Sequence, residues 1–311
     1  MDTYQNKDEN NNINPYDDGI NLVDFFFILW KRKFLISFFI VSAAISSVFY
    51  AVSLPNIYTS SALLTPSNQQ DSLSSKLQGF SAIAGLAGVN LPQDSGNSST
   101  EAIARIKSFN FFSNHFLPQI KPENLVAVTE WMPENNIILY DENIYNQRTK
   151  TWANNPLQKS LSSTQKAFKT YKSILSINKN AKTSFITISI DHRSPIIAKE
   201  WVEKIISSIN NLMQEEDIKR AENAVSFLND AYKSTNNQSL RDGISSLLES
   251  QIKILMLATS NDDYVYKVLD SPIVPEKNSA PGRALLCILG TLLGGMLGVM
   301  LTLFLHFFRR D

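Results

Sequence analysis

The residues that could do covalent chemistry do not combine in a recognisable catalytic pattern in this chain. The sequence has three histidines, His115, His192 and His306, which lie far apart and fall in different predicted elements. No nucleophile motif or recognisable pair of catalytic carboxylates accompanies them. The single cysteine, Cys287, lies in an apolar run, which excludes a disulfide framework and a cysteine-based zinc site. We therefore expect a protein that is not an enzyme and that has no catalytic, cofactor-binding or metal-binding residues.

Residues that could bind a charged ligand are concentrated in the middle of the chain. Lys plus Arg equals Asp plus Glu, at 29 each, so the net charge does not indicate a nucleic-acid partner. From Asn143 to Ile190, however, the sequence has no acidic residue. The basic residues of this run are Arg148, Lys150, Lys159, Lys166, Lys169, Lys172, Lys179 and Lys182. They could attract anionic sugars or an acidic face of a neighbour, but a solvated helix face is the commoner explanation, and we favour it.

Four large aromatic residues lie in or beside the same region. Trp131, Tyr140, Tyr145 and Trp152 occur in a segment that prolines interrupt. Aromatic faces could stack on sugar rings, but they more often anchor a loop to the core. We favour the second interpretation.

Three glycines recur at four-residue spacing inside an apolar run, at Gly290, Gly294 and Gly298. Small residues at this spacing let two helices approach closely in a membrane. An earlier apolar run offers small side chains that could receive them, namely Ser42, Ala43, Ser46 and Ser47. We interpret the glycines as a packing face between membrane helices, within or between protomers. The alternative is that glycine is simply common in such helices.

Two uncharged stretches are long enough to cross a membrane. Phe34 to Leu54 contains 21 residues, and Ala284 to Phe308 contains 25 residues without Asp, Glu, Lys or Arg. At about 1.5 Å per residue, each matches or exceeds a hydrocarbon core of roughly 30 Å. We therefore predict transmembrane helices at 34–54 and 284–308, with residues 55–283 forming a domain between them.

Basic residues that flank the two stretches predict the orientation. They are Lys31, Arg32, Lys33, Arg309 and Arg310. Because positive residues stay in the cytoplasm, we expect residues 1–33 and 309–311 there and residues 55–283 outside. The first stretch is too long for the core of a cleaved signal peptide, so we expect a retained anchor. The aromatic segment just before it is either a short interfacial helix or an extension of the first transmembrane helix.

Apolar periodicity places strands near the two chain crossings and long helices between them. We expect strands at about 56–67, 183–192 and 263–272, helices at about 100–113, 163–177, 195–233 and 239–258, and irregular backbone at 118–158. Thr100 is the expected N-cap of its helix, and Pro195 suits the first turn of the longest one. Pro272, Pro275 and Pro281 would hold the chain extended before the second span. The expected fold is α+β, with a small membrane-proximal sheet and long extended helices.

This order of elements resembles that of the bacterial polysaccharide co-polymerases, the chain length determinant (Wzz) family. The resemblance covers about residues 20–308 and is strongest at both ends. Its markers are "LVDFFFILWKRKFLI", "YTSSALLTP", "DSPIVPEKNSAPGRAL" and the glycine-striped second span. One branch of the family carries a cytoplasmic tyrosine kinase after the second span. No GxxxxGK[ST] motif occurs here, so the chain is similar to the short, kinase-free branch.

The resemblance implies a bacterial inner-membrane protein whose periplasmic domains, residues 55–283, assemble into a ring of identical subunits. It implies regulation of surface polysaccharide chain length, above all of lipopolysaccharide O-antigen, without a cofactor. The implied partners are further copies of the chain, the polymerase, onto which the glycines could also pack, and the growing lipid-linked polysaccharide. Alternatives are a length regulator of an exopolysaccharide or capsule, a membrane adaptor of a polysaccharide export system, and a sensor. A sensor would need output machinery, for which the three residues after the second span leave no room.

Overall fold

The computed structural model describes residues 29–67, 98–153, 162–260 and 263–308. The chain divides into two compact units. One contains the apolar helices near both ends of the chain, and the other runs from Pro55 to Pro281. Each is described by itself.

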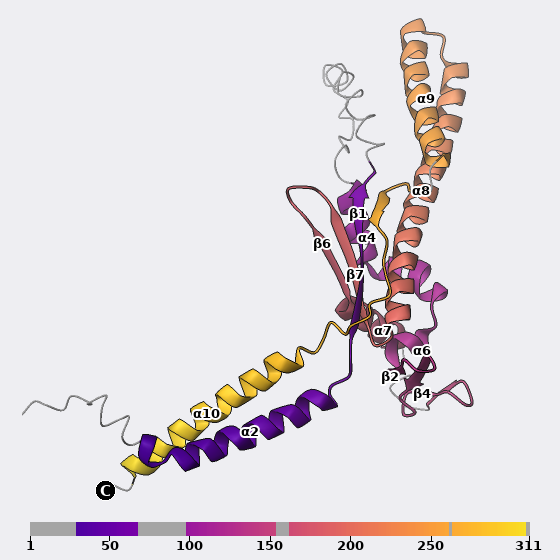
Figure 1. The fold of residues 1–311 in the computed structure, drawn as a ribbon. Helices are drawn as coiled ribbons and strands as arrows, with labels where there is room; N and C mark the ends of the chain where they lie inside the picture. The colour runs from indigo at the N-terminus through magenta and orange to yellow at the C-terminus, as the bar shows by residue number, and fades with distance from the viewer. Residues whose placement is uncertain (1–28, 68–97, 154–161, 261–262, 309–311) are drawn as a thin grey trace, which may run out of the picture. The chain divides into compact units, whose positions relative to one another are not determined.

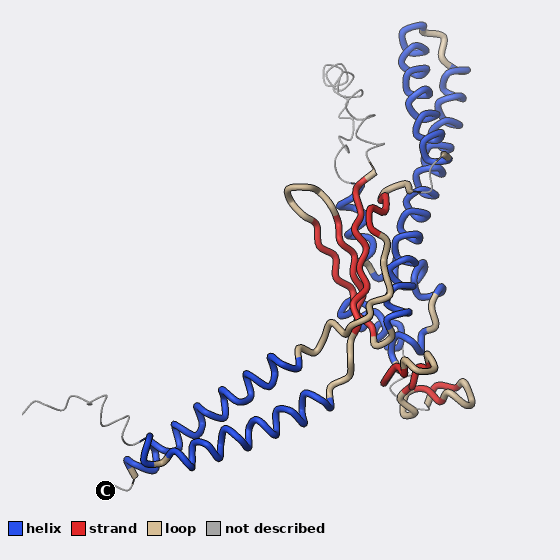
Figure 2. The backbone as a smooth tube through the Cα atoms, in the orientation of Figure 1, coloured by secondary structure: helices blue, strands red, loops and turns tan. Residues whose placement is uncertain are grey.

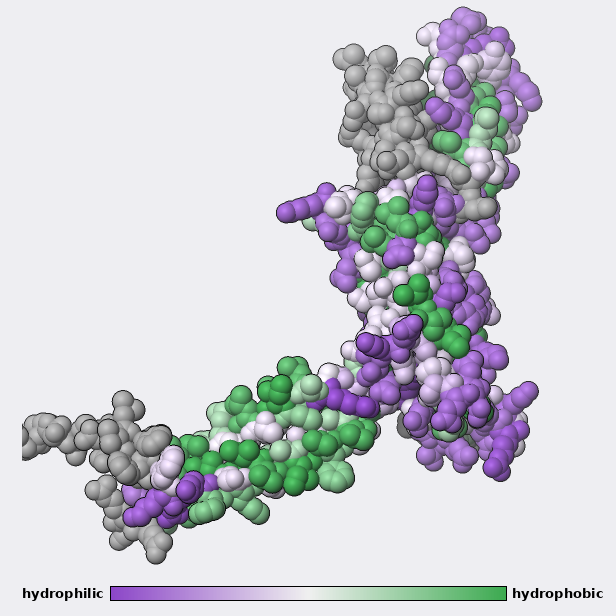
Figure 3. Space-filling view, in the orientation of Figure 1, coloured by the Kyte–Doolittle hydropathy of each residue, from purple (hydrophilic) through white to green (hydrophobic). Residues whose placement is uncertain are grey.

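The first unit is a pair of long apolar helices, α2 (Lys33–Ser53) and α10 (Arg283–Phe307), which lie against each other (Figure 1). Both are long and apolar enough to cross a membrane. Their exposed surface is almost entirely hydrophobic in the space-filling view (Figure 3). Such a surface would be costly in water and is typical of helices in lipid.

The second unit is built on a four-stranded antiparallel sheet with strand order β6-β7-β1-β8. The strands are β1 (Tyr58–Pro66), β6 (Leu175–Lys179), β7 (Ile186–His192) and β8 (Tyr266–Asp270). Every second side chain of β7 is buried, beginning at Ile186, so one face of the sheet forms the core. Strand β1, which begins the unit, pairs with both β7 and β8.

The core face of the sheet is covered by α8 (Pro195–Ser234), a helix of 40 residues. Ser194 caps it by accepting a hydrogen bond from the backbone N–H of Ile197, and Pro195 occupies the first turn. Trp201, Ile205 and Ile209 are buried against the sheet. The second half of α8 pairs with α9 (Gln238–Thr259) in a helical hairpin, which we call the arm (Figure 1).

Shorter elements complete the core. They are α4 (Ser98–Ile106), α5 (Phe109–Phe111), a π-helix at Phe112–Phe116, a 3-10 turn at Leu117–Gln119, α6 (Pro122–Val126) and α7 (Ser162–Ile174). Phe112, Phe116 and Tyr171 form a fully buried aromatic cluster, with ring centroids 5.0–6.3 Å apart. The Tyr171 hydroxyl donates to the carbonyl of Ile106, which ties α7 to α4.

Two small ribbons follow α6, drawn in red in Figure 2. The first pairs β2 (Val128–Met132) with β3 (Ile137–Tyr140), and the second pairs β4 (Tyr145–Asn146) with β5 (Thr151–Trp152). The predicted irregular backbone at 118–158 is therefore wrong in part, because these ribbons and α6 lie within it.

The predicted α+β fold with two membrane-length helices and long helices between them is confirmed. Three local predictions are wrong. The helix expected at 100–113 is broken after Ile106, because the Ser108 hydroxyl accepts a hydrogen bond from the N–H of Phe111 and caps a new helix. Thr100 is not an N-cap, since α4 already begins at Ser98. The helix expected at 163–177 ends at Ile174, where β6 follows at once.

Candidate functional site

The three glycines of α10 line the face that meets α2. A Cβ atom on Gly290 would lie 2.5 Å from the Cβ of Ser47, and one on Gly294 would meet the Cβ of Ala43. A Cβ on Gly298 would lie 3.2 Å from the Cα of Ile36. Side chains larger than hydrogen therefore do not fit between the helices at Gly290 and Gly294 without displacement. This close approach is the geometry that small-residue stripes permit in membranes.

The small residues of α2 divide between two faces. Ala43 and Ser47 face α10, whereas Ser42 and Ser46 are exposed and are not among the atoms nearest to the three glycines. The difference follows from helix geometry, since one residue turns the side chain by about 100°. The structure therefore does not place Ser42 and Ser46 in the packing face that the sequence predicts. The Ser47 hydroxyl is satisfied within its own helix by the carbonyl of Ala44, at 2.8 Å.

The predicted orientation residues at the start of α2 are partly described. The Lys33 ammonium lies 5.3 Å from the ring centroid of Trp30 and 5.7 Å from that of Phe34. Lys31 and Lys33 are exposed and Arg32 is half-buried. This mixture of cationic and aromatic side chains is typical of the membrane–water interface. Arg309 and Arg310 lie outside the described residues.

The proline segment runs beside the first half of β1. The N–H of Ile57 donates to the carbonyl of Ala280 at 2.9 Å, and the Ser60 hydroxyl donates to the carbonyl of Ile273 at 2.7 Å. Pro272 is buried, and Pro275 and Pro281 are half-buried. Because prolines donate no backbone hydrogen bond, the contacts here combine one backbone bridge, between Ile57 and Ala280, with hydrogen bonds through the hydroxyls of Ser60 and Ser279. The first and last residues of the second unit are thus held together.

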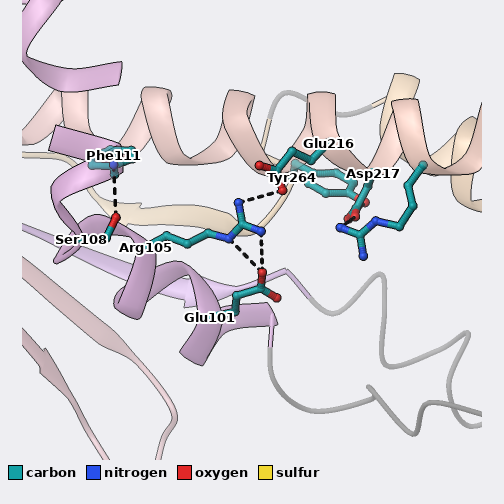
Figure 4. Close-up of polar contacts among 8 residues, drawn as sticks. Glu101, Arg105, Ser108, Phe111, Glu216, Asp217 and Tyr264 are labelled. Carbon is teal, nitrogen blue, oxygen red and sulfur yellow. Dashed lines mark hydrogen bonds and ion pairs between the residues drawn. The ribbon is translucent and has the colours of Figure 1, made fainter. Parts of the chain in front are cut away.

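An ion-pair network lies where the arm leaves the core (Figure 4). The Arg105 guanidinium on α4 lies 2.7 Å from the carboxylate of Glu101 and 2.7 Å from that of Glu216 on α8. The hydrogen bond from Arg105 lowers the pKa of the Glu216 carboxyl group, and these carboxylates raise the pKa of Arg105. The network therefore ties α4 to α8 as long as the Glu216 carboxylate is ionised, and acid would weaken it.

A second set of polar contacts fixes the strand that follows the arm. The buried Asn210 side chain on α8 accepts hydrogen bonds from the N–H groups of Val265 and Tyr266 and donates to the carbonyl of Tyr266. The Tyr264 hydroxyl donates to the Asp217 carboxylate at 2.7 Å (Figure 4). Burial and this hydrogen bond raise the pKa of Tyr264. Asn210 sits in the apolar stripe of α8, and that interruption is the one sequence signal that could have identified it.

His192 at the end of β7 is buried beside Trp201, with ring centroids 4.9 Å apart. Its Nδ1 accepts from the N–H of Ser194 at 2.9 Å, and its Nε2 lies 2.9 Å from the carbonyl of Asn124. The contacts assign the proton to Nε2. Burial lowers the pKa of His192, so the ring is a neutral structural link to α6.

The aromatic residues between 131 and 152 do not form one cluster. Tyr145 is buried, with Tyr140 and Trp152 packed edge-on against it at 5.4 and 5.2 Å. Trp131 instead packs on Tyr58 at 5.5 Å. The favoured interpretation, a core anchor, describes Tyr145, whereas Trp152 is exposed. The basic residues of the acid-free run that the structure describes are exposed as well.

The described residues contain no group of three or more His, Cys, Asp or Glu side chains that could hold a metal ion. His115, His192 and His306 belong to different elements, as the sequence indicates: His115 lies in the π-helix and His306 in α10. The features with functional potential are therefore surfaces: the glycine face of α10, the arm, and the exposed ribbons.

Comparison with known proteins finds a family similarity over the first third of the chain. The model of the family described as Wzz, chain length determinant protein, matches residues 18–110. A full-length bacterial polysaccharide co-polymerase is 16% identical, with a TM-score of 0.40 over 93% of this chain and 99% of that chain. A fragment of WzzB, a polysaccharide co-polymerase from Salmonella Typhimurium, is 13% identical, with a TM-score of 0.29 over 72% of this chain and 100% of that chain. No curated protein matches the sequence. Over residues 18–110, which include α2, β1 and α4, the chain is thus similar to the chain length determinant (Wzz) family.

Proposed function

We propose that this protein regulates the chain length of a bacterial surface polysaccharide, lipopolysaccharide O-antigen in the first instance. It acts as an oligomeric scaffold in the inner membrane that modulates the polymerase and performs no catalysis itself. The observation that carries the proposal is the family match over residues 18–110, which includes a helix able to cross a membrane.

The proposed topology has two transmembrane helices, both termini in the cytoplasm, and the unit from Pro55 to Pro281 in the periplasm. It is supported by Lys31, Arg32 and Lys33 directly before the first apolar helix. It is also supported by the division of the chain, since the two apolar helices form one unit and the residues between them form the other.

The proposed oligomer is supported by the apolar surface of the arm. Its exposed apolar side chains are Phe227, Leu240, Leu247, Ile252 and Met256. Water-exposed apolar side chains grouped on a two-helix hairpin indicate an interaction surface. In a homo-oligomer, the same surface of a neighbouring copy would cover it.

The experiment is a polysaccharide ladder gel of a strain that lacks the gene. We expect the modal length to be lost and the ladder to become a steadily decreasing series. Re-expression of the full chain should restore the modal length. A ladder that is unchanged after deletion would contradict the proposal.

A further inference from the structure

The β4–β5 ribbon presents an aromatic ring and two cationic side chains at the surface. Residues 147–150 connect its strands, which pair Tyr145 with Trp152 and Asn146 with Thr151. Trp152 is 42% exposed, whereas Tyr145 beneath it is only 8% exposed. A tryptophan this exposed is unusual, because the residue is highly buried on average.

The exposed ring is held in place by the rings beneath it. Tyr145 contacts Trp152 edge-on at 5.2 Å and contacts Tyr140 at 5.4 Å. Tyr140 is fixed in turn, because its hydroxyl donates to the side-chain oxygen of Asn124 at 2.6 Å. Trp152 is thus a supported platform, and a ligand that stacks on it would not have to order it first.

Residues 147–150, which connect the two strands, are held in place by hydrogen bonds within the ribbon, without a bound ligand. The side-chain oxygen of Asn146 accepts from the N–H groups of Arg148 and Thr149, at 3.0 and 3.2 Å. Within the described residues, neither Arg148 nor Lys150 forms an ion pair with an acidic side chain. The carboxylate of Asp141, which precedes the ribbon in the chain, accepts hydrogen bonds from the main chain and side chain of Asn143. Two exposed cationic groups therefore remain available on the ribbon that carries Trp152.

An acidic saccharide matches this combination. The C–H face of a pyranose ring packs on an indole, and a carboxylate or phosphate on the sugar pairs with a guanidinium or ammonium group. A neutral glycan would leave Arg148 and Lys150 unused, and a bare anion would leave Trp152 unused. We propose that the β4–β5 ribbon is a contact site for acidic sugar residues of the polysaccharide. This inference rests on the proposed function, because it names the polymer as a direct ligand.

The experiment measures glycan binding to the full chain in nanodiscs of neutral phosphatidylcholine. The probes are hexagalacturonate, as an acidic saccharide, and maltohexaose, as a neutral one. We expect hexagalacturonate to bind more tightly and to weaken as salt rises, since exposed charge pairs are screened. Trp152→Ala, and separately Arg148→Gln with Lys150→Gln, should each weaken binding by about tenfold or more.

Two further variants test whether a loss of binding comes from misfolding or from a general loss of positive charge. Trp152→Phe keeps an aromatic face and should retain most of the affinity, so a general folding defect is distinguished from a lost platform. Lys166→Gln with Lys182→Gln removes the same charge from α7 and from the β6–β7 turn, and it should change affinity less than threefold. Absence of hexagalacturonate binding, or equal binding by Trp152→Ala, overturns the inference.

Anionic membrane lipid is the competing ligand. Vesicles that contain phosphatidylglycerol would compete with hexagalacturonate and bind with the same variant profile if the ribbon were a lipid contact, which would overturn the inference. The binding assay is independent of the ladder gel. Loss of the modal length on gene deletion, combined with no glycan binding, would reject this site and leave the proposed function in place.

Discussion

At the scale of single residues, Asn210 shows how one polar side chain fixes the path of the chain after the arm. Its amide replaces a missing strand neighbour for Val265 and Tyr266, because it pairs with two N–H groups and a carbonyl. A buried polar group that is fully paired gives a unique arrangement, whereas its loss leaves unpaired partners.

We expect Asn210→Leu to lower the free energy of unfolding by on the order of 2–5 kcal/mol, since the buried N–H groups of Val265 and Tyr266 lose their acceptor. Denaturant unfolding of the full chain in micelles, followed by circular dichroism, measures this. Asn211→Leu is the matched control, because the next residue is exposed and should change stability little. Equal effects of the two variants would contradict the role assigned to Asn210.

His192 makes the stability depend on pH. Burial holds its pKa below the ordinary value of about 6.5, so below that pH the unfolded chain binds a proton that the folded chain does not. The free energy of unfolding should therefore fall as the pH drops through about 6.5, by up to about 1.4 kcal/mol per unit. Unfolding curves between pH 5 and 8 test this. His192→Gln should remove that part of the slope, and an unchanged slope would contradict the assignment.

At the scale of elements, the close packing of α2 against α10 requires glycine, which has no side chain, at particular positions of α10. Gly294 faces Ala43, with the carbonyl of Phe39 at 3.0 Å from a Cβ atom. Gly295, the next residue, would place its Cβ atom 3.6 Å from Ile40, which is an ordinary contact. These adjacent glycines therefore differ in how much substitution they tolerate.

We expect Gly294→Leu to separate the helices at this point without preventing membrane insertion, and Gly295→Leu to be tolerated. Fluorescence energy transfer measures this separation in a Cys287→Ser background. One fluorophore is attached to Lys33→Cys at the start of α2, and the other to Phe308→Cys directly after α10. The efficiency of energy transfer should fall in Gly294→Leu and stay at the wild-type value in Gly295→Leu. Equal efficiencies would show that the glycine face is not required for packing.

Long periodic elements could be predicted from the sequence, whereas short ones and their boundaries could not. The 40-residue α8 follows from its apolar stripe and Pro195, and the membrane-length helices follow from uncharged length alone. Strand β6 was missed because it continues directly from α7 with no turn residue to mark the change. The break at Ser108 depends on one side-chain hydrogen bond that competes with helix continuation.

The residues that form the candidate surfaces could also be predicted only in part, because their contacts depend on tertiary structure. Four-residue spacing identifies the glycine stripe, but which small residues of α2 meet it depends on the rotation of that helix about its axis. Ala43 and Ser47 face α10, while Ser42 and Ser46 do not. Arg105 on α4 meets Glu216 on α8 only through tertiary structure, so no local pattern could have paired them.

At the scale of the whole molecule, the arm is the surface we expect to control assembly. Leu240 and Leu247 lie seven residues apart on one face of α9 and are both exposed. Leu240→Glu with Leu247→Glu should reduce the number of subunits in the detergent-extracted complex, because charge would replace apolar contact. The number of subunits is obtained by measuring the mass of the complex.

The control places the same charges at Ser239 and Ser246, which have the same spacing and are exposed on an adjacent face. We expect Ser239→Glu with Ser246→Glu to leave the mass of the complex closer to that of the wild type. A complex of unchanged mass in the leucine variant would show that this face of the arm takes no part in assembly.

Strand β1 has a consequence for the order of events during synthesis. Thr59 is hydrogen bonded to Asp191, 132 residues later, and Ser60 to Ile273, 213 residues later. At about 5–20 residues per second, a ribosome needs on the order of 10–40 s to complete the partners of a strand it has already released. During that interval β1 has open edges on both sides while the apolar helix before it is already available to the membrane. A chain that stops before β7 therefore leaves an unpaired apolar strand, and the proteases that degrade incomplete proteins should remove it.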